Sequence, residues 1–120
     1  MANILIVDDS TMSRNKLKKI LISGGHLVVG EAADGGEAIE KYQALNPDIV
    51  TLDITMPNMN GIDCLKEILA LDQEASVVMI SALGKGDTIL EALNAGALNY
   101  ISKPFEAEVV LDILNDAMGE

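Results

Sequence analysis

Residues 49–61 read IVTLDITMPNMNG and place a short, mostly β-branched run directly before an acidic residue and a loop. The run at residues 49–52 has little polar alternation, which is typical of a strand buried on both faces of a parallel sheet. Asp53 follows this run at once, and Pro57 and Gly61 are turn residues that predict a loop after it. This stretch therefore predicts a buried strand that ends at a carboxylate.

Similar apolar runs recur along the chain and alternate with helical patterns. The other predicted strands cover residues 4–7, 27–29 and 77–80, with a weaker one at 100–101. Between them, apolar residues recur every three or four positions, which is the spacing of an amphipathic helix. These helical patterns run through Leu17, Ile20 and Leu21; Ala38, Ile39, Tyr42 and Leu45; Leu65, Ile68 and Leu69; Ile89, Ala92 and Leu93; and Val109, Val110, Ile113 and Leu114.

Helix-end signals agree with this division. Ser10 and Asp87 can begin helices, and Gly24–Gly25 and Gly96 can end them as left-handed caps. Five strand–helix units with short connections imply right-handed crossovers and a parallel sheet with helices on both faces. The expected fold class is therefore α/β, a doubly wound five-stranded parallel sheet. The periodicity does not determine the order of the strands.

The composition limits the chain to one domain and narrows its partners. With 120 residues, 49% of them apolar, residues 1–120 can form one domain with a substantial core. The net charge of −11 argues against binding bare nucleic acid or an anionic membrane, because phosphates attract clustered Lys and Arg. No apolar stretch is long enough to span a bilayer, and the amino terminus enters the first strand without a cleavable leader, so we expect a cytoplasmic protein. The single cysteine, Cys64, agrees with a reducing compartment.

Polar residues whose side chains can bind ligands or react lie at the carboxyl ends of the predicted strands. Asp8 and Asp9 follow the first strand, Asp53 the third and Ser81 the fourth, while Lys103 lies just after the fifth. The carboxyl ends of parallel strands share one edge of the sheet, where such domains usually bind their ligands. We therefore expect three carboxylates, a hydroxyl and an ammonium group to meet in one crevice.

Three carboxylates in one place need a positive charge. Two of them held about 4 Å apart repel by roughly 4 kcal/mol at an effective dielectric constant near 20. Oxygen ligands without His or Cys favour Mg2+, which keeps several waters and shares its shell with phosphoryl oxygens. A carboxylate beside such a cation can attack phosphorus, and Asp53 is best placed because an open loop follows it. Lys103 and Ser81 are groups that stabilise phosphoryl oxygens.

The same residues match the motifs of a known family. Asp8–Asp9, residues 53–61, Ser81–Ala82 and Lys103–Pro104–Phe105 together resemble the receiver domains of two-component response regulators. The resemblance covers essentially the whole chain, and this ordered set of motifs is far more specific than an acidic pair alone. It implies the flavodoxin-like (β/α)5 fold with strand order 2-1-3-4-5. It also implies a signalling module rather than an enzyme.

The resemblance implies a role for each acidic residue. Asp53 would be the phosphoacceptor, phosphorylated by a sensor histidine kinase or by a small donor such as acetyl phosphate. Asp8, Asp9, Asp53 and the backbone carbonyl of Thr55 would bind Mg2+, the expected cofactor. The metal and the phosphoryl group would thus occupy the same crevice.

The resemblance also implies a conformational switch. Ser81 and Lys103 would hold the acyl phosphate, and the family often has the Lys103–Pro104 peptide bond in cis. Tyr100 would swing inward as Ser81 moves, which would reshape the surface built by the fourth and fifth helices and the fifth strand. Such a change is a population shift between two packed states, biased by contacts to the phosphoryl group.

Two features suggest the narrower class of single-domain chemotaxis regulators. The chain stops after the fifth helical pattern, and residues 53–63 look like the chemotaxis receivers of bacteria outside the enteric group. This resemblance implies a CheA-like kinase as donor, the flagellar motor switch as target and a phosphatase as a further partner. The alternative is a receiver domain from a longer regulator with a DNA-binding or methylesterase output domain.

Two positions bear on the rate of dephosphorylation and on a competing function. Thr55 and Leu83 lack the amide and carboxylate side chains that some relatives carry beside the phosphate, so we expect a fairly long-lived phosphorylated state. Residues 53–57 are also similar to Mg2+-dependent phosphatases of the haloacid dehalogenase type, which use an Asp nucleophile. Those enzymes place a second Asp two positions later, where this chain has Thr55, so hydrolysis has no obvious proton-transfer group.

His26 has no catalytic partner in sequence, and we expect it to be structural or solvated.

Overall fold

Strands and helices alternate along the chain, as predicted from the sequence. The structure is a computed structural model that describes residues 1–82 and 86–119. The strands are β1 (Asn3–Val7), β2 (Leu27–Ala32), β3 (Ile49–Leu52), β4 (Val77–Ser81) and β5 (Asn99–Ser102). The helices are α1 (Thr11–Ser23), α2 (Gly35–Leu45), α3 (Gly61–Leu71), α4 (Gly86–Ala95) and α5 (Ala107–Ala117).

The strands form one parallel sheet in the order β2-β1-β3-β4-β5. This order confirms the doubly wound, flavodoxin-like fold. The chain moves outward from β1 to β2 and then returns to the other side of β1 as β3, so the loops after β1 and β3 lead to helices on opposite faces. A reversal of this kind opens a crevice at the carboxyl edge of the sheet.

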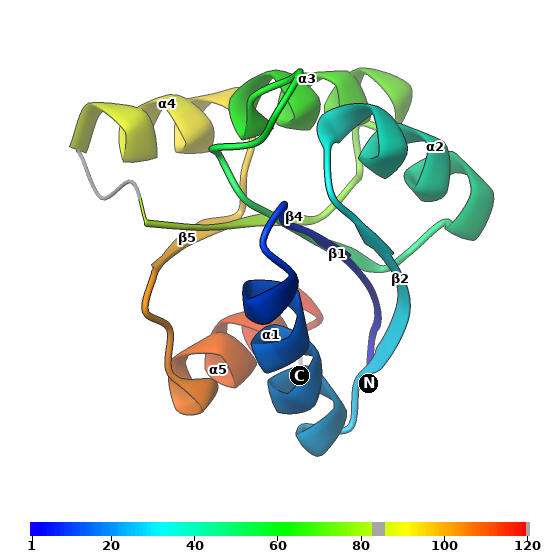
Figure 1. Ribbon diagram of the computed structural model, residues 1–120, viewed down its shortest axis with the longest axis vertical. Coiled ribbons are helices and arrows are strands. Elements are labelled where there is room, and N and C mark those ends of the chain that lie inside the picture. The colour runs from blue at the N-terminus through cyan, green and yellow to red at the C-terminus, as the bar shows by residue number, and fades with distance from the viewer. Residues whose placement is uncertain (83–85, 120) are drawn as a thin grey trace.

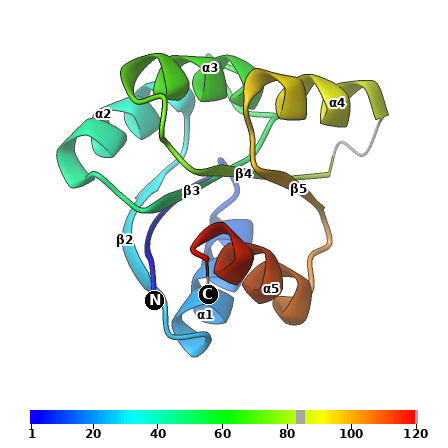
Figure 2. The same ribbon diagram turned by 180° about the vertical axis from the view of Figure 1, so that it is seen from behind.

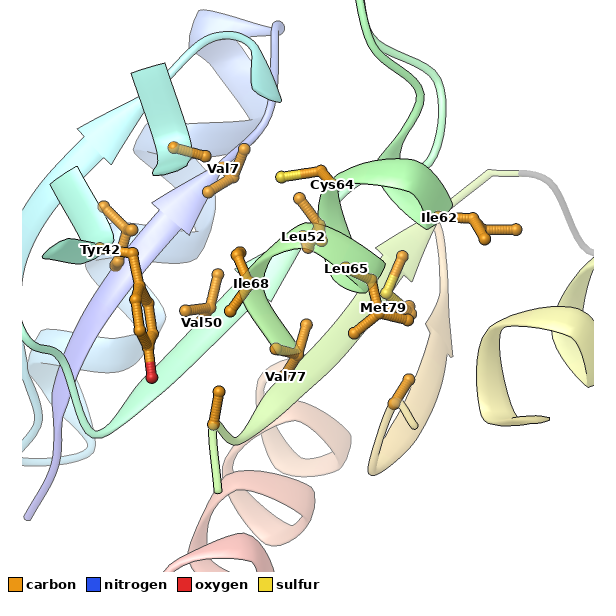
Figure 3. Packing of buried hydrophobic residues seen from close by; sticks show 14 of the residues in the cluster. Val7, Tyr42, Val50, Leu52, Ile62, Cys64, Leu65, Ile68, Val77 and Met79 are labelled. Atoms are coloured by element: carbon orange, nitrogen blue, oxygen red, sulfur yellow. The ribbon is translucent and has the colours of Figure 1, made fainter. Parts of the chain in front are cut away.

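Helices cover both faces of the sheet. Figures 1 and 2 show α2, α3 and α4 on one side and α1 and α5 on the other. Side chains alternate between the two layers along each central strand, so that in β1 Leu5 and Val7 face the first layer while Ile4 and Ile6 face the second. Figure 3 shows how the first of these cores packs α2 and α3 against the central strands.

The expectation of strands buried on both faces is right for the centre of the sheet and wrong at its edge. The side chains of β3 and β4 are all buried. In β2, however, Leu27 is 51% exposed and the next four residues are only half-buried. The reason is that β2 is an edge strand with one neighbour, and its sequence pattern carries no signal of that position.

Helix ends follow the predicted residues with two adjustments. The Ser10 hydroxyl caps α1 by accepting a hydrogen bond from the Ser13 amide at 3.2 Å. After α1 the left-handed residue is Gly25, with φ of 85°, while Gly24 before it is not left-handed. Asp87 lies inside the first turn of α4 rather than before it. A carboxylate in the first turn still stabilises a helix because it faces the positive end of the helix dipole.

His26 has a structural position, as expected. It is buried just before β2, where its Nδ1 accepts a hydrogen bond from the Ala2 amide at 3.0 Å and its Nε2 lies 3.2 Å from Oδ1 of Asn115. The imidazole therefore ties the amino terminus to α5, far from the carboxyl edge of the sheet. Within the described ranges, the helices are too short or too polar to cross a membrane.

Candidate functional site

Asp8 and Asp53 extend two neighbouring strands of the sheet. Val7 pairs with Leu52, so the residues that follow them stand side by side. The Asp53 amide donates to the Val7 carbonyl at 3.0 Å, and the Asp8 amide donates to the carbonyl of Ala32 on β2 at the same distance. Both aspartates are 6% exposed. The sheet itself therefore fixes the two backbones that carry these carboxylates.

Asp9 completes a cluster of three carboxylates. One oxygen each of Asp8, Asp9 and Asp53 lies within 4.8 Å of the others, and Asp9 is exposed while the other two are buried. The cluster offers only oxygen ligands and opens to solvent on the Asp9 side. This donor set fits Mg2+, which takes carboxylate ligands and keeps several of its waters. The structure thus brings together the three predicted acidic residues.

Lys103 reaches the same cluster from the end of β5. Its Nζ donates to Oδ2 of Asp8 at 2.7 Å and to Oδ2 of Asp53 at 3.1 Å. Burial lowers the pKa of Lys103, but the hydrogen bonds and charges of the two carboxylates outweigh it and raise that pKa above its usual value. The Lys103–Pro104 bond is cis. Part of the compensating charge that the carboxylates require therefore comes from the protein itself.

Burial has the opposite effect on the acidic partner. Desolvation raises the pKa of Asp8 above its ordinary value, although hydrogen bonds from Lys103 and from the Ser10 amide lower it and the charge of Asp53 raises it again. The carboxylate is thus held in a position where its charge is costly without a cation. Such a perturbed group in a crevice indicates a functional site.

Ser81 and Tyr100 lie next to each other beside the carboxylates. Ser81 ends β4 and is 1% exposed, and its carbonyl accepts a hydrogen bond from the Lys103 amide at 3.0 Å. Burial raises the pKa of the Tyr100 phenol, a hydrogen bond with the Ser81 side chain lowers it, and the charge of Asp53 raises it. The half-buried Tyr100 ring also packs against the core beneath α2 and α3. The two predicted switch residues are therefore in contact.

Comparison with known proteins gives the same assignment as the geometry. Residues 4–115 match the family described as Response regulator receiver domain. The chain belongs to this family. Receiver domains of this type are signalling modules that bind Mg2+ in an acidic pocket, and the three aspartates form such a pocket here.

Several similar relatives of this receiver domain are chemotaxis regulators. It is 50% identical over 112 residues to the chemotaxis protein CheY of Thermotoga maritima, covering 93% of each chain. It is 47% identical over 116 residues to CheY of Bacillus subtilis, covering 97% of each. In the CheX-CheY-BeF3-Mg+2 complex from Borrelia burgdorferi, the matching chain is 46% identical with a TM-score of 0.93, over 97% of this chain and 88% of that one. The receiver domain is thus most like CheY.

The loop after Asp53 closes tightly on the receiver site. The Ile54 amide donates to Oδ1 of Asp53 at 2.7 Å, and the Gly61 amide donates to the Ile54 carbonyl at 2.6 Å. A Cβ atom at Gly61 would lie 1.9 Å from the Asp53 carbonyl oxygen. Sequence reasoning treated Gly61 only as a turn residue. Thr55, two residues after Asp53, is exposed, and Leu83 lies outside the described residues.

Sequence reasoning also missed an arginine beneath the receiver site. Arg14 lies in the first turns of α1, and its Nη1 donates to the Asp8 carbonyl at 2.6 Å. Its Nε pairs with Oε1 of Glu31 at 3.2 Å. The only available signal was a basic residue one turn after the Ser10 cap, and such a residue is more often a solvated charge.

Proposed function

We propose that the protein is a phosphorylated switch of a two-component chemotaxis system, with Asp53 as the phosphoacceptor. The observation that carries this proposal is the position of the Asp53 carboxylate. It is clustered with Asp8 and Asp9 within 4.8 Å and lies 3.1 Å from Nζ of Lys103. Among the described carboxylates, Asp8 and Asp53 both combine burial, two acidic neighbours and a bound ammonium group. Of these two, the resemblance to receiver domains gives the phosphoacceptor role to Asp53. That environment suits an attack on phosphorus.

The proposed reaction transfers a phosphoryl group from a histidine kinase. A carboxylate oxygen of Asp53 attacks phosphorus and forms an O–P bond, while the P–N bond of the phosphohistidine breaks. The electron pair of that bond stays on the imidazole nitrogen, which takes up a proton. The product is an acyl phosphate on Asp53. Acetyl phosphate reacts in the same way, with acetate as the leaving group.

The surrounding residues would offset the negative charges of the attacking carboxylate and the phosphoryl group. Asp8, Asp9, Asp53 and the Thr55 carbonyl would hold Mg2+, whose charge offsets that of the attacking carboxylate and of the phosphoryl oxygens. Lys103 now binds Oδ2 of both buried aspartates, and we propose that its ammonium moves to a phosphoryl oxygen when Asp53 is modified. Charge-assisted hydrogen bonds to the carboxylates are then replaced by one to the phosphoryl group.

The switch is proposed to run through Ser81 and Tyr100. A serine hydroxyl can accept one hydrogen bond while it donates another. Ser81 can therefore donate to a phosphoryl oxygen on Asp53 while Tyr100 remains bound to it. Because Tyr100 already contacts Ser81 and packs against the core, we propose that phosphorylation stabilises this arrangement relative to an outward one. The surface formed by α4, β5 and α5 changes as a result.

The partners follow from the similarity to chemotaxis regulators. We propose a CheA-like histidine kinase as donor and the flagellar motor switch as target. We also propose that residues 1–120 act in the cytoplasm as one receiver domain. This domain would bind neither nucleic acid nor membrane directly. We propose a phosphatase as a further partner. We propose a long-lived phosphorylated state, because Thr55 has no amide that could orient an attacking water. A half-life of seconds without a phosphatase would contradict this.

Intact-mass spectrometry after incubation with acetyl phosphate and Mg2+ tests the proposal. We expect the wild-type mass to rise by one phosphoryl group and Asp53→Asn to remain unmodified. Asp63→Asn is the matched control, because Asp63 is an exposed carboxylate in the first turn of α3 and should leave the adduct unchanged. An adduct that persists in Asp53→Asn would refute the assignment. Sustained release of inorganic phosphate from a phosphate ester would instead indicate a phosphatase.

A further inference from the structure

The partly buried guanidinium of Arg14 holds the peptide that joins two of the acidic residues. The Arg14 side chain is 17% exposed, and its Nη1 donates to the Asp8 carbonyl at 2.6 Å. That carbonyl belongs to the peptide between Asp8 and Asp9. On its other side, the Asp8 amide donates to the Ala32 carbonyl at 3.0 Å. The backbone of Asp8 is therefore held from both directions, by β2 and by Arg14.

Glu31 holds Arg14 in turn. Its Oε1 accepts from Nε of Arg14 at 3.2 Å, and its Oε2 accepts from Nζ of Lys18 at the same distance. Nη2 of Arg14 donates to the hydroxyl of Thr11 at 3.3 Å. All three nitrogens of the planar guanidinium thus donate hydrogen bonds at once, which fixes its orientation more firmly than a single contact could. The unit of Glu31 and Arg14 forms a rigid support below the acidic loop.

Asp9 depends on this support for its direction. Its carboxylate is exposed, and no side chain within residues 1–82 and 86–119 hydrogen-bonds to it. The direction in which the Asp9 side chain leaves the loop is therefore set by the peptide before it. Arg14 is the side chain that binds the carbonyl of that peptide.

The charge of Arg14 does not explain its position. A cation beside a metal site repels the metal, so charge alone would make Arg14 unfavourable there. Its positive charge is paired with Glu31, and the cation that binds the two buried carboxylates is Lys103. The contribution of Arg14 is to fix the orientation of the Asp8–Asp9 peptide. The two explanations predict opposite changes in Mg2+ affinity when the guanidinium is removed.

We infer that Arg14, held by Glu31, is a positioning residue that orients the Asp8–Asp9 peptide for Mg2+ binding. The inference rests on the proposed function, since it concerns the same metal site. Loss of residues that support metal ligands typically weakens metal affinity about 10- to 100-fold. We expect Arg14→Met to raise the Mg2+ dissociation constant about tenfold. If Arg14 acted only through its charge, the same substitution would lower that constant.

Calorimetric titration with Mg2+ separates the two cases. Lys19→Met is the matched control, because it removes one positive charge from an exposed position on the same helix. We expect its dissociation constant to stay within about twofold of wild type, as for a screened surface charge. An unchanged or lower constant for Arg14→Met would overturn the inference. Wild-type protein that bound no Mg2+ would instead overturn the proposed function itself.

Two further measurements exclude a merely structural effect. In reactions with acetyl phosphate, Arg14→Met should need more Mg2+ for half-maximal phosphorylation but reach the wild-type rate at saturation. A lowered rate at saturating Mg2+ with an unchanged half-maximal concentration would count against positioning. Glu31→Gln should weaken Mg2+ binding less than Arg14→Met, and the double variant should be no weaker than Arg14→Met alone, because Glu31 acts through Arg14. Additive effects would overturn this link, and Glu31→Gln alone decides the matter if Arg14→Met does not fold.

Discussion

Gly61→Ala is the substitution for which the structure sets the clearest expectation. A Cβ at this position would lie 1.9 Å from the Asp53 carbonyl oxygen, and 2.7 Å from both the Asp53 carbonyl carbon and the Ile54 Cα. Real Cβ atoms essentially never approach closer than 3.0 Å, so a separation of at least 1.1 Å (3.0 − 1.9) must be gained. All three atoms are backbone, and no rotamer change relieves the overlap. The Asp53–Ile54 peptide itself must move.

The cost follows from the contacts that this movement breaks. The Gly61–Ile54 and Ile54–Asp53 hydrogen bonds, at 2.6 and 2.7 Å, contribute about 1 kcal/mol each. Overlap in a packed region costs about 1–3 kcal/mol more. We therefore expect a loss of roughly 3–5 kcal/mol, or about 12–20 °C in the unfolding temperature of a domain of this size. A displacement of about 1 Å at a reacting group can also slow the reaction about 100-fold, and we expect that effect on Asp53 phosphorylation.

Thermal unfolding by circular dichroism and phosphorylation by acetyl phosphate measure the two effects. Gly36→Ala is the matched control, because the nearest heavy atom to its Cβ is Oδ1 of Asp34 at 3.5 Å, an ordinary contact. Since Gly36 lies in α2, alanine there should be neutral or stabilising by up to about 1 kcal/mol. If Gly61→Ala unfolded within about 2 °C of wild type and was phosphorylated normally, the account of the loop would be wrong.

Three other substitutions or treatments test separate features. Asp9→Asn removes a carboxylate that is repelled by two others and should stabilise the metal-free protein, but by no more than about 1 kcal/mol because an exposed charge is screened. The variant should also lose most of the rise in unfolding temperature that Mg2+ gives the wild type. A full Mg2+ response in the variant would contradict this. Thr51→Val should stabilise the fold by about 1 kcal/mol, because the Thr51 hydroxyl is buried without a hydrogen-bond partner among the described residues; a lower urea midpoint would count against it. Burial raises the pKa of the Cys64 thiol to about 12 from 9.0, so the folded protein should resist thiol reagents at pH 8. The unfolded chain releases that proton near pH 9, so the free energy of unfolding should fall as pH rises from about 9 towards 12, and labelling of folded and urea-unfolded protein at equal rates would refute this account.

Local residue patterns were sufficient for the elements and for the place of the site. The run of Val77 to Ile80 is apolar at every position because both of its faces are covered, and that requirement is visible in the sequence. The meeting of Asp8 with Asp53 was predictable because the carboxyl ends of parallel strands share an edge. The strand order was expected only from family resemblance, since periodicity does not contain it.

The partners of individual side chains could not be read in the same way. Lys103 was expected at the crevice, but its bonds to Asp8 and Asp53 span 95 and 50 residues. The pairing of Arg14 with Glu31 spans 17 residues and joins α1 to an edge strand. Sequence patterns report the environment averaged over an element. They do not report which atoms meet when elements from distant parts of the chain pack together.

By itself, the sequence determined the alternation of buried strands and amphipathic helices and the gathering of acidic residues at one edge, because both follow from repeating local chemistry. Only the tertiary structure decided that Lys103 binds two of the carboxylates, that Arg14 binds the peptide between Asp8 and Asp9, and that Gly61 leaves no room for a side chain. These features depend on distances of a few ångströms between elements, which packing of the whole domain sets.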